Sequence, residues 1–472
     1  MSKELTRFLM FMRPAFSRQA THVWFVIVFV GFLVRNDTLG VSSIIRALSL
    51  PSESYNCLLH FFHSTAWNIE GLMALWWSWL LQRNVAYRLQ GHLVLTGDHT
   101  KTPKDGRKMP AVATLHQDSE TASKPSFFRG HHWGCIGILV RAGEKYFSTP
   151  LLASIQEGLD AFADLGRERL PKTTCIVKMA QQVAMAMGSS AYLVLDAYFA
   201  VGPVFTTAAE KVNAAGDIIH ILTRAKKNVV AYLSPPPRKE HQRGPSRKYG
   251  EKLRLMELFE SRADMFQTAE ALVYRNSETI RYLTLNLIWK PIKGTLRFIL
   301  VETSHGRIIL MTSDLTLDPI AALQLYCHRV TIETLFDTLK NTMGGMAYHF
   351  WSQYLSPASR RPRKKTLQCQ NSSAPAKTQN TIAAIEKFVN IQLLVMGILQ
   401  LLAKSYPEQV KAKAQCWLRT VTSNTPSEFV TQTAMAKTIK NNLYGLGKDW
   451  ITQLIREKQI EHKKRGLHKK VA

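Results

Sequence analysis

The spacing of hydrophobic and polar positions changes several times along the chain. Over residues 1–90, apolar residues recur in runs such as IIRALSL and GLMALWWSWLL, separated by polar turns, which predicts helices. From residue 91 onward, the apolar runs GHLVLTGDHT and SSAYLVLDAYF predict buried strands, whereas GLDAFADLGRERL and TTCIVKMAQQVAMAM predict helices. Strands that alternate with helices indicate an α/β layer structure.

The middle of the chain is rich in predicted strands. WGCIGILVRAGEKYFSTPLL predicts two strands joined by the glycine-containing turn AGEK, and the preceding FFRGHHWG predicts a turn beside a strand rather than a zinc site. The proline-rich and basic segment Ser234 to Arg254 predicts an exposed loop. In IRYLTLNLIW, Leu283, Leu285 and Leu287 alternate with polar or aromatic residues, and LRFILVET and RIILMTS follow as further strands.

The last part of the chain returns to a helical pattern. Ser359 to Thr381 is polar, basic and rich in turn residues, so it predicts a linker or a long loop. The segment from residue 382 onward predicts helices, and its final residues, REKQIEHKKRGLHKKVA, form a strongly basic tail.

The charge narrows the choice of partners. The chain has 61 Lys and Arg against 34 Asp and Glu, a net charge of +27, and a pI near 9.9. Such a field attracts polyanions, either nucleic acid or an anionic membrane surface. The apolar run Val23 to Val34 is shorter than the ~20 residues that span a bilayer, so it predicts a buried helix rather than an anchor. The six cysteines are scattered, which favours reduced thiols over a disulfide scaffold or zinc ribbon.

The stretch YCHRVTIETLFDTLK places four chemically distinctive residues on one side of a predicted helix. At about 100° per residue, Tyr326, Arg329, Glu333 and Lys340 fall on a stripe about 60° wide. Taken alone, this pattern is also that of an amphipathic helix with a solvated face, on which Arg329 and Glu333 form an i,i+4 ion pair.

Two aspartates give the stretch another meaning. Asp98 and Asp196 each end an apolar, strand-like run, where an unpaired buried carboxylate would be costly. Together with Glu333, they would make three carboxylates that repel one another unless a cation lies among them. Mg²⁺ prefers such oxygen ligands, and two ions held by carboxylates can support phosphoryl transfer.

These residues resemble a known family. Tyr326, Arg329, Glu333 and Lys340 match the spacing Y-x2-R-x3-E-x6-K, the signature of a large family of bacterial insertion-sequence transposases in the DDE superfamily, which has an RNase H-like core. Asp98 in LTGDHTKTPKDG and Asp196 in YLVLDAYF resemble the two aspartates that precede the glutamate. The family fills the long interval before the glutamate with a mostly β insertion.

The resemblance implies an α/β fold in which an RNase H-like mixed-sheet core is interrupted by a mostly β insertion, with helical N- and C-terminal regions. The expected order is a helical DNA-binding region (1–90), the first part of the catalytic core (91–205), the β-rich insertion (206–318), the second part of the core with the glutamate helix (319–356), a basic linker (357–381) and a helical region for dimerisation that ends in the basic tail (382–472).

The resemblance also implies the activity and the role of each residue. The protein would be a cut-and-paste transposase that binds terminal inverted repeats, cleaves DNA and transfers the 3′-hydroxyl end to target DNA. Asp98, Asp196 and Glu333 would be the catalytic residues and would hold two Mg²⁺ ions, with Mn²⁺ as a substitute. Tyr326, Arg329 and Lys340 would contact DNA. A homodimer on double-stranded DNA, no membrane association and a cytoplasmic, nucleoid-associated location are expected.

One position departs from the family pattern. Some members carry a tryptophan just before the last strand of the insertion, which stacks on an extruded base. RIILMTSD instead has Arg307 and Ile308 there, and Trp289 lies earlier.

Three alternatives remain at this stage. An RNase H-like nuclease without strand transfer would share the carboxylates, and a catalytically silent derivative would only bind DNA. A basic membrane-associated protein would share the charge.

Overall fold

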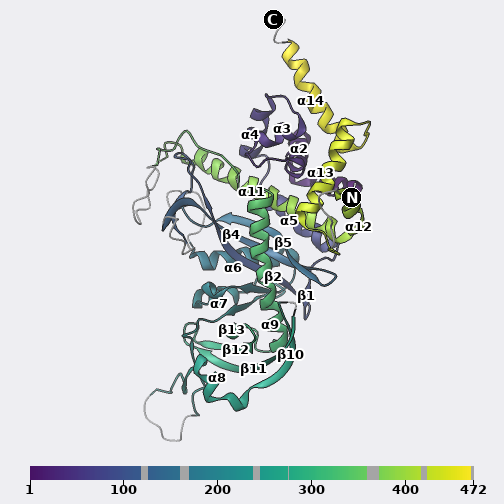
Figure 1. The fold of residues 1–472 in the computed structure, drawn as a ribbon. Helices are drawn as coiled ribbons and strands as arrows, with labels where there is room; N and C mark the ends of the chain where they lie inside the picture. The colour runs from purple at the N-terminus through teal and green to yellow at the C-terminus, as the bar shows by residue number, and fades with distance from the viewer. Residues whose placement is uncertain are drawn as a thin grey trace.

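The computed structural model describes residues 1–117, 126–159, 170–237, 245–274, 276–358, 372–415 and 423–468. It has an RNase H-like α/β core, a β-rich insertion and two helical regions (Figure 1). The insertion lies at one end of the molecule, the core sheet in the middle, and the N- and C-terminal helices together at the other end. The predicted fold class is therefore confirmed.

The core sheet has five strands in the order β5-β4-β2-β6-β7. Strand β4 pairs antiparallel with β2 and β5, whereas β6 and β7 run parallel to β2. A parallel neighbour requires a crossover connection, which helices α6 and α7 supply. The bounds are β2 His92–Pro103, β4 Phe127–Ala142, β5 Lys145–Ile155, α6 Lys172–Met187, β6 Ala191–Leu195, α7 Gly202–Ala208 and β7 Ile219–Arg224.

Burial explains why the core strands read as continuous apolar runs. All five residues of β6 are buried, and so are Leu93 to Gly97 in β2. A strand covered on both faces gains from apolar residues at every position, so alternation disappears. The turn between β4 and β5 lies at AGEK as predicted, with Gly143 at a φ of 62°.

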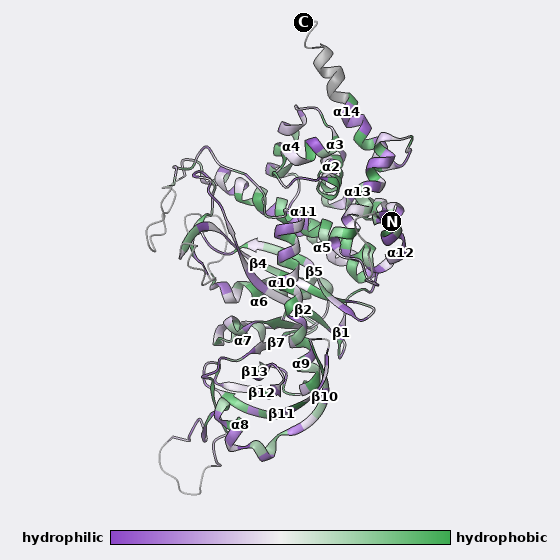
Figure 2. Ribbon diagram, in the orientation of Figure 1, coloured by the Kyte–Doolittle hydropathy of each residue, from purple (hydrophilic) through white to green (hydrophobic). Residues whose placement is uncertain are grey.

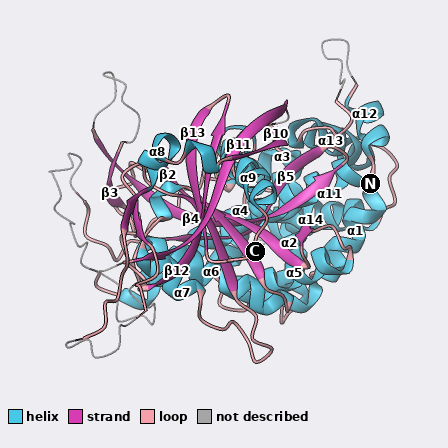
Figure 3. Ribbon diagram, turned by 90° about the horizontal axis from the view of Figure 1, so that it is seen from below, coloured by secondary structure: helices cyan, strands magenta, loops and turns pink. Residues whose placement is uncertain are grey.

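The insertion extends the core sheet instead of forming a detached unit. Strand β13 pairs antiparallel with β7, and the order continues as β13-β12-β11-β8-β9, which gives a 13-stranded sheet within the described residues. Seen from below, the strands fan through the middle of the molecule with helices around them (Figure 3). The remaining elements here are β1 Arg88–Leu89, β3 Ala113–His116, β8 Val230–Tyr232, β9 Lys252–Arg254, α8 Leu258–Ser261, β10 Gln267–Val273, β11 Asn276–Trp289, β12 Gly294–Thr303 and β13 Gly306–Thr312.

The two helical regions pack together and cover the open side of β5. The N-terminal region contains α1 Ser2–Phe11, α2 Gln19–Val34, α3 Ser42–Leu48, α4 Ser54–His63 and α5 Ile69–Gln82; the C-terminal region contains α11 Pro375–Ser405, α12 Pro407–Ala414, α13 Glu428–Tyr444 and α14 Trp450–His468. Hydrophobic residues concentrate on α5 and α11 where these helices meet (Figure 2). The apolar run in α2 is buried as predicted.

Side chains from α5 and α11 bond to the outer backbone edge of β5. The Asn390 side chain donates to Ala153 O and accepts from Ala153 N, and the Glu386 carboxylate accepts from Ile155 N. The indole N–H of Trp76 donates to Pro150 O. These bonds satisfy backbone groups that an open sheet edge would leave unpaired.

One described helix, α11, is long and apolar enough to cross a membrane, but 94% of its most apolar stretch is buried inside the fold. Such burial is typical of the central helix of a large core.

Two local predictions need correction, and two others fall largely outside the described residues. FFRGHHWG is not a turn, because its residues lie within β4. The linker predicted to reach residue 381 ends earlier, since α11 begins at Pro375; residues 359–371 lie outside the described part. The helix predicted for GLDAFADLGRERL and the middle of the loop between Ser234 and Arg254 also lie outside it.

The stretch from Tyr326 to Lys340 is not one regular helix. It is divided among α9 Pro319–His328, α10 Val330–Asp337 and a π-helical turn, η6 Thr338–Thr342. The hydroxyl of Thr331 donates to His328 O, and a side-chain bond of this kind to a preceding carbonyl bends helices. The π-turn then changes the angular spacing of the residues that follow.

Candidate active site

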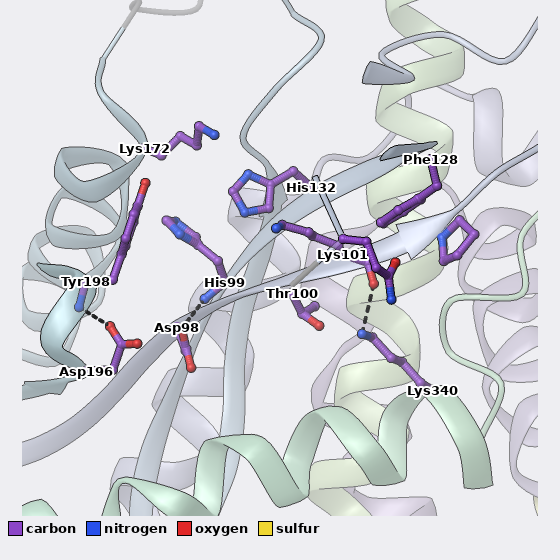
Figure 4. A pocket seen from close by; sticks show the side chains of 12 residues that line it. Asp98, His99, Thr100, Lys101, Phe128, His132, Lys172, Asp196, Tyr198 and Lys340 are labelled. Atoms are coloured by element: carbon purple, nitrogen blue, oxygen red, sulfur yellow. Dashed lines mark hydrogen bonds between the residues drawn. The ribbon is translucent and has the colours of Figure 1, made fainter. Parts of the chain in front are cut away.

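The two aspartates lie side by side at one edge of the core sheet. The parallel register of β2 and β6 pairs Thr96 with Val194, and Asp98 and Asp196 lie two residues further along their respective chains. Neighbouring strands are about 4.8 Å apart, so these carboxylates face the same region of space. The backbone anchors both: Asp98 Oδ1 accepts from His99 N at 2.7 Å, and Asp196 Oδ1 accepts from Tyr198 N at 2.9 Å (Figure 4).

The environment of Asp98 disfavours its charged form. Burial is the main cause that raises the pKa of Asp98 to about 7, and the negative charge of Asp196 adds to the rise. The bond from His99 N and the charge of Arg329 oppose it. A buried carboxylate beside a second one holds a proton at neutral pH unless positive charge is brought to it.

Arg329 connects Asp98 to Glu333. Its Nη1 lies 3.6 Å from Asp98 Oδ2, and its Nη2 donates to Glu333 Oε1, one helical turn away. Burial opposes the charge of Arg329, but Glu333 and Asp98 together raise its pKa. The arrangement therefore brings Asp98, Asp196, Arg329 and Glu333 together, and a guanidinium offsets part of the negative charge.

The other two residues of the predicted stripe are placed differently from each other. Tyr326 does not lie on a solvated face: it is 7% exposed and packs with Val194 and Leu222, and burial raises its pKa. Lys340, in the π-turn, donates to Lys101 O at 2.9 Å, and burial lowers its pKa. The break at Arg329 and the π-turn divide the stretch into three segments, so the four residues do not share one face.

A cavity of about 690 Å³ opens beside the aspartates. Acidic residues lie at one end, and the lysines Lys101, Lys172 and Lys340 line other parts of the wall (Figure 4). The full lining is Asp98, His99, Thr100, Lys101, Pro103, Gln117, Phe128, His132, Lys172, Asp196, Tyr198 and Lys340. The cavity wall therefore contains both carboxylates and lysines. The lysines can bind a polyanion beside the two aspartates.

Sequence reasoning did not identify several of these residues. The rings of His99 and His132 lie 4.7 Å apart, and burial, with His132 nearby, lowers the pKa of His99 to about 3, so that His99 is neutral at pH 7. Tyr198 is half-exposed at the rim. The position of His99 next to Asp98 and of Tyr198 two residues after Asp196 is the only signal the sequence offered.

Two aromatic residues of the insertion bear on the departure from the family pattern. Trp289 is 7% exposed and packs edge-on against Phe205, so it is not available to stack on a base. Tyr274, in the turn between β10 and β11, has a φ of 46° and is 49% exposed. Burial of its hydroxyl raises the pKa of Tyr274, and the charges of Arg329 and Glu333 act on it, so the turn lies near the site.

The donor chemistry of the site fits a hard divalent cation only in part. Asp98 and Asp196 supply oxygen donors to one cavity, and a cation there would offset the burial and the charge of Asp196 that raise the pKa of Asp98. Glu333 is engaged by Arg329. No group of three or more His, Cys, Asp or Glu within the described ranges is close enough to hold a metal ion. Glu333 would therefore have to leave Arg329 to complete such a set.

Comparison with known proteins identifies the family of the chain. No protein of curated function matches the chain. A family model described as DDE superfamily endonuclease matches residues 12–284, which include Asp98 and Asp196, whereas Arg329 and Glu333 lie beyond the match. Since the match covers more than half of the 472 residues, the chain belongs to the DDE superfamily of endonucleases, which act on DNA and typically use divalent metal ions.

Proposed function

We propose that the protein is a cut-and-paste DNA transposase of the insertion-sequence type. The observation that carries the proposal is the meeting of Asp98, Asp196, Arg329 and Glu333 at one edge of an RNase H-like sheet. The spacing of Tyr326, Arg329, Glu333 and Lys340 adds the family signature, and the β insertion between Asp196 and Glu333 adds the expected architecture.

Asp98, Asp196 and Glu333 are the proposed catalytic residues and metal ligands. Two Mg²⁺ ions, or Mn²⁺ in their place, would supply charge for the attacking and leaving oxygens of phosphoryl transfer. Arg329 donates to Glu333 and lies near Asp98. We propose that this guanidinium turns to a phosphate of the bound DNA, to which its planar fork is matched, and so frees Glu333 to join the aspartates.

The reaction proposed is two successive displacements at phosphorus. A water oxygen attacks the phosphorus at the transposon end, the bond to the 3′-oxygen breaks, and the products are a 3′-hydroxyl and a 5′-phosphate. The freed 3′-hydroxyl then attacks a phosphodiester of the other strand or of target DNA. A new phosphodiester bond forms, the bond from that phosphorus to its 3′-oxygen breaks, and the attacked strand leaves with a 3′-hydroxyl. We propose that Lys340, which lines the cavity and donates to Lys101 O, would hold a phosphate beside the carboxylates. Positioning and charge neutralisation account for most of the catalysis in this scheme.

The remaining parts of the proposal concern partners and location. The N-terminal helices and basic loops would bind the terminal inverted repeats, in keeping with the net charge of +27. Two copies would act together through the C-terminal helices, where Leu446 and Tyr444 are 93% and 67% exposed. The protein would work in the cytoplasm on the nucleoid.

The decisive variant is Glu333→Gln, which keeps the shape of the side chain and removes its charge. It should bind repeat DNA like the wild type and lose nicking of a labelled repeat end. The matched control is Asp337→Asn, an exposed carboxylate one turn further along α10, which should nick normally. Wild-type nicking by Glu333→Gln would show that the site is misassigned.

Strand transfer separates the transposase from a simple nuclease. A labelled, pre-nicked repeat end is incubated with supercoiled plasmid and Mg²⁺, and joined products are counted. Joining supports the transposase, whereas efficient nicking without joining would favour the nuclease.

A further inference from the structure

A second cavity, of about 430 Å³, lies where the N-terminal and C-terminal helical regions meet. Its walls come from the end of α2 and the loop after it, from the turn η6, and from one side of α13, which lies beside α2 (Figure 1). We call it the α13 cavity. The full lining is Leu33, Arg35, Asn36, Asp37, Thr38, Thr342, Met343, Phe429, Gln432, Thr433, Ala436, Lys437 and Lys440.

Two hydrogen bonds attach α13 to the end of α2. Gln432 Nε2 donates to Phe32 O at 3.4 Å, and Lys440 Nζ donates to Asn36 Oδ1 at 3.2 Å. The Asn36 amide is neutral, so its bond to Lys440 fixes the ammonium without cancelling its charge. Lys437, three residues earlier on the same side of α13, is exposed and also lines the cavity. Two ammonium groups therefore come to the cavity from one helix face.

Arg35 joins the N-terminal region to the segment after η6. Its Nη2 donates to Met343 O at 2.6 Å and to Gly344 O at 3.0 Å, and its Nη1 donates to Ser43 Oγ at 3.1 Å. Burial lowers the pKa of Arg35 to about 10, so the guanidinium is charged at neutral pH. All three acceptors are neutral, and Nε has no hydrogen-bond partner in the described part of the chain. A buried charge of this kind is stabilised by an anion nearby.

The charges around the α13 cavity are not balanced. Three of the lining residues are cations, and one, Asp37, is acidic. Asp37 is already paired, since Arg46 donates to its Oδ2 at 3.0 Å and to its Oδ1 at 2.9 Å. Among the described residues, no carboxylate forms an ion pair with Lys437 or Lys440. The cavity therefore has an excess of positive charge that an anionic partner would neutralise.

The α13 cavity borders the active site through η6. Lys340 lines the cavity beside the aspartates, and Thr342, in the same π-turn, lines the α13 cavity. A helix with its side chains is about 10–12 Å across, and one DNA strand advances about 3.4 Å per nucleotide. DNA held at Lys340 therefore reaches the α13 cavity within about three to four nucleotides.

We propose that the α13 cavity binds the sugar–phosphate backbone of DNA next to the segment held at the active site, with phosphates at Lys437 and Lys440. Hydroxyl and amide groups, on Thr38 and Asn36, accompany the lysines, and groups of these kinds supply most protein contacts to DNA phosphates. Such contacts fix the position of the DNA without reading its sequence. This inference rests on the proposed function, since it assumes that DNA occupies the site at Asp98.

The salt dependence of DNA binding tests these contacts. The affinity of the full-length protein for a duplex repeat end is measured in EDTA, so that no cleavage occurs, over about 50 to 200 mM salt. Each phosphate contact contributes about 0.9 to the slope of log K against log salt, so the double variant Lys437→Gln, Lys440→Gln should lower the slope by about 1.8. Lys437→Gln alone, at an exposed side chain, should lower it by about 0.9.

Two control variants show whether the lost contacts belong to the α13 cavity. The double variant Lys437→Arg, Lys440→Arg keeps both charges and should keep the wild-type slope. The double variant Lys411→Gln, Lys413→Gln removes two charges from the neighbouring helix α12, outside the lining of the cavity. It should also leave the slope unchanged.

Shortening the DNA locates the contact. The duplex is cut back one nucleotide at a time from the cleavage point, first on one side and then on the other. Wild type and the double glutamine variant at Lys437 and Lys440 should differ in affinity for the long duplexes. On one of the two sides, the difference should disappear once fewer than about three to four nucleotides remain, because the strand no longer extends past η6.

Three results would overturn the inference. One is a wild-type salt slope in Lys437→Gln and in the double glutamine variant, or an equal fall in the α12 control. Another is a difference in affinity that is the same at every DNA length. The third is a change in sedimentation of the glutamine variant without DNA, which would make the cavity a contact between copies. The proposed function fails in a different way, through nicking by Glu333→Gln or absence of strand transfer, and neither outcome alters the affinity measured in EDTA.

Discussion

The two halves of the candidate site are built on different kinds of backbone. Asp98 and Asp196 stand on neighbouring parallel strands, and β2 is hydrogen-bonded to β4 on one side and β6 on the other. Glu333 and Lys340 stand on a helical segment that begins after the break at Arg329 and ends in a π-turn. Side-chain contacts such as Lys340 to Lys101 O hold this segment to β2.

This difference separates what is fixed from what is adjustable. The pairing of β2 with β6 fixes the spacing of Asp98 and Asp196. Their two negative charges therefore repel each other whatever the helix half does. Glu333 is 51% exposed at its side chain and is held by Arg329 alone among the described contacts that involve its carboxylate. The two aspartates of the strand half are thus stabilised by a nearby positive charge, and Arg329 of the helix half supplies that charge.

The largest effect should come from the strand half. Asp98→Asn keeps the size of the side chain but removes a buried charge that would hold metal, so nicking should fall by about three orders of magnitude or more, a loss comparable to removing a principal electrostatic group. Nicking of a labelled repeat end under single-turnover conditions measures it. Binding of the DNA in EDTA should remain, and loss of binding would instead indicate that the variant is misfolded.

Arg329→Gln, in the helix half, should have a smaller effect. The variant loses a phosphate contact and also frees Glu333 from its ion pair, so the two consequences partly offset each other. Nicking should fall about 100-fold, as for loss of one donor to a developing charge. Arg329→Lys keeps the charge without the planar fork and should recover part of the rate. A rate for Arg329→Gln equal to that of Asp98→Asn would mean that the two halves are not separable.

The strand half was also the part that the sequence predicted best. LVLTGD and YLVLD end in aspartate after short buried runs, and the strands form where the pattern placed them. The pattern alone does not say that these two strands are neighbours, since pairing is decided by the whole sheet; the resemblance to the transposase family supplied the order. The position of the β insertion in the chain followed from the same resemblance.

The helix half was predicted less well because its shape depends on individual local hydrogen bonds that the sequence pattern does not reveal. The angular spacing from Tyr326 to Lys340 assumes a straight helix, whereas one hydroxyl bond from Thr331 and one π-turn alter the phase. Tyr326, on α9, is buried in the cluster beneath the sheet instead of facing solvent. Lys172 could not be found from the sequence, because only the tertiary fold brings it to the cavity.

The repulsion at Asp98 predicts how stability changes with pH. The pKa of Asp98 is about 7 in the folded protein, compared with 3.8 for an aspartate in the unfolded chain. Between these two pH values, the folded protein therefore binds a proton that the unfolded chain does not. Stability from this group is therefore lost as the pH rises from about 4 to about 7 and stays low above it. In EDTA, the thermal midpoint of Asp98→Asn relative to wild type should increase over that range, by a few degrees at pH 8.

The comparison with Asp98→Asn is needed because other groups titrate nearby. Buried histidines with lowered pKa values, such as His99, destabilise the folded wild type and the variant alike below about pH 6. Adding Mg²⁺ at pH 8 should raise the midpoint of wild type and not that of the variant. A constant difference between the two proteins from pH 4 to 8 would contradict the environment assigned to Asp98.

The smallest effect is expected at Tyr326, where packing and DNA contact predict different outcomes. Its ring is buried with Val194 and Leu222, so Tyr326→Phe keeps the packing and should change DNA affinity and nicking by less than about threefold. Tyr326→Ala leaves a cavity and should cost about 3–5 kcal/mol of unfolding free energy, measured by urea denaturation. If Tyr326→Phe instead lost tenfold in affinity with unchanged stability, its hydroxyl would have to reach the DNA. The helix half would then have to rotate on binding, whereas the release of Glu333 requires only the Arg329 side chain to turn.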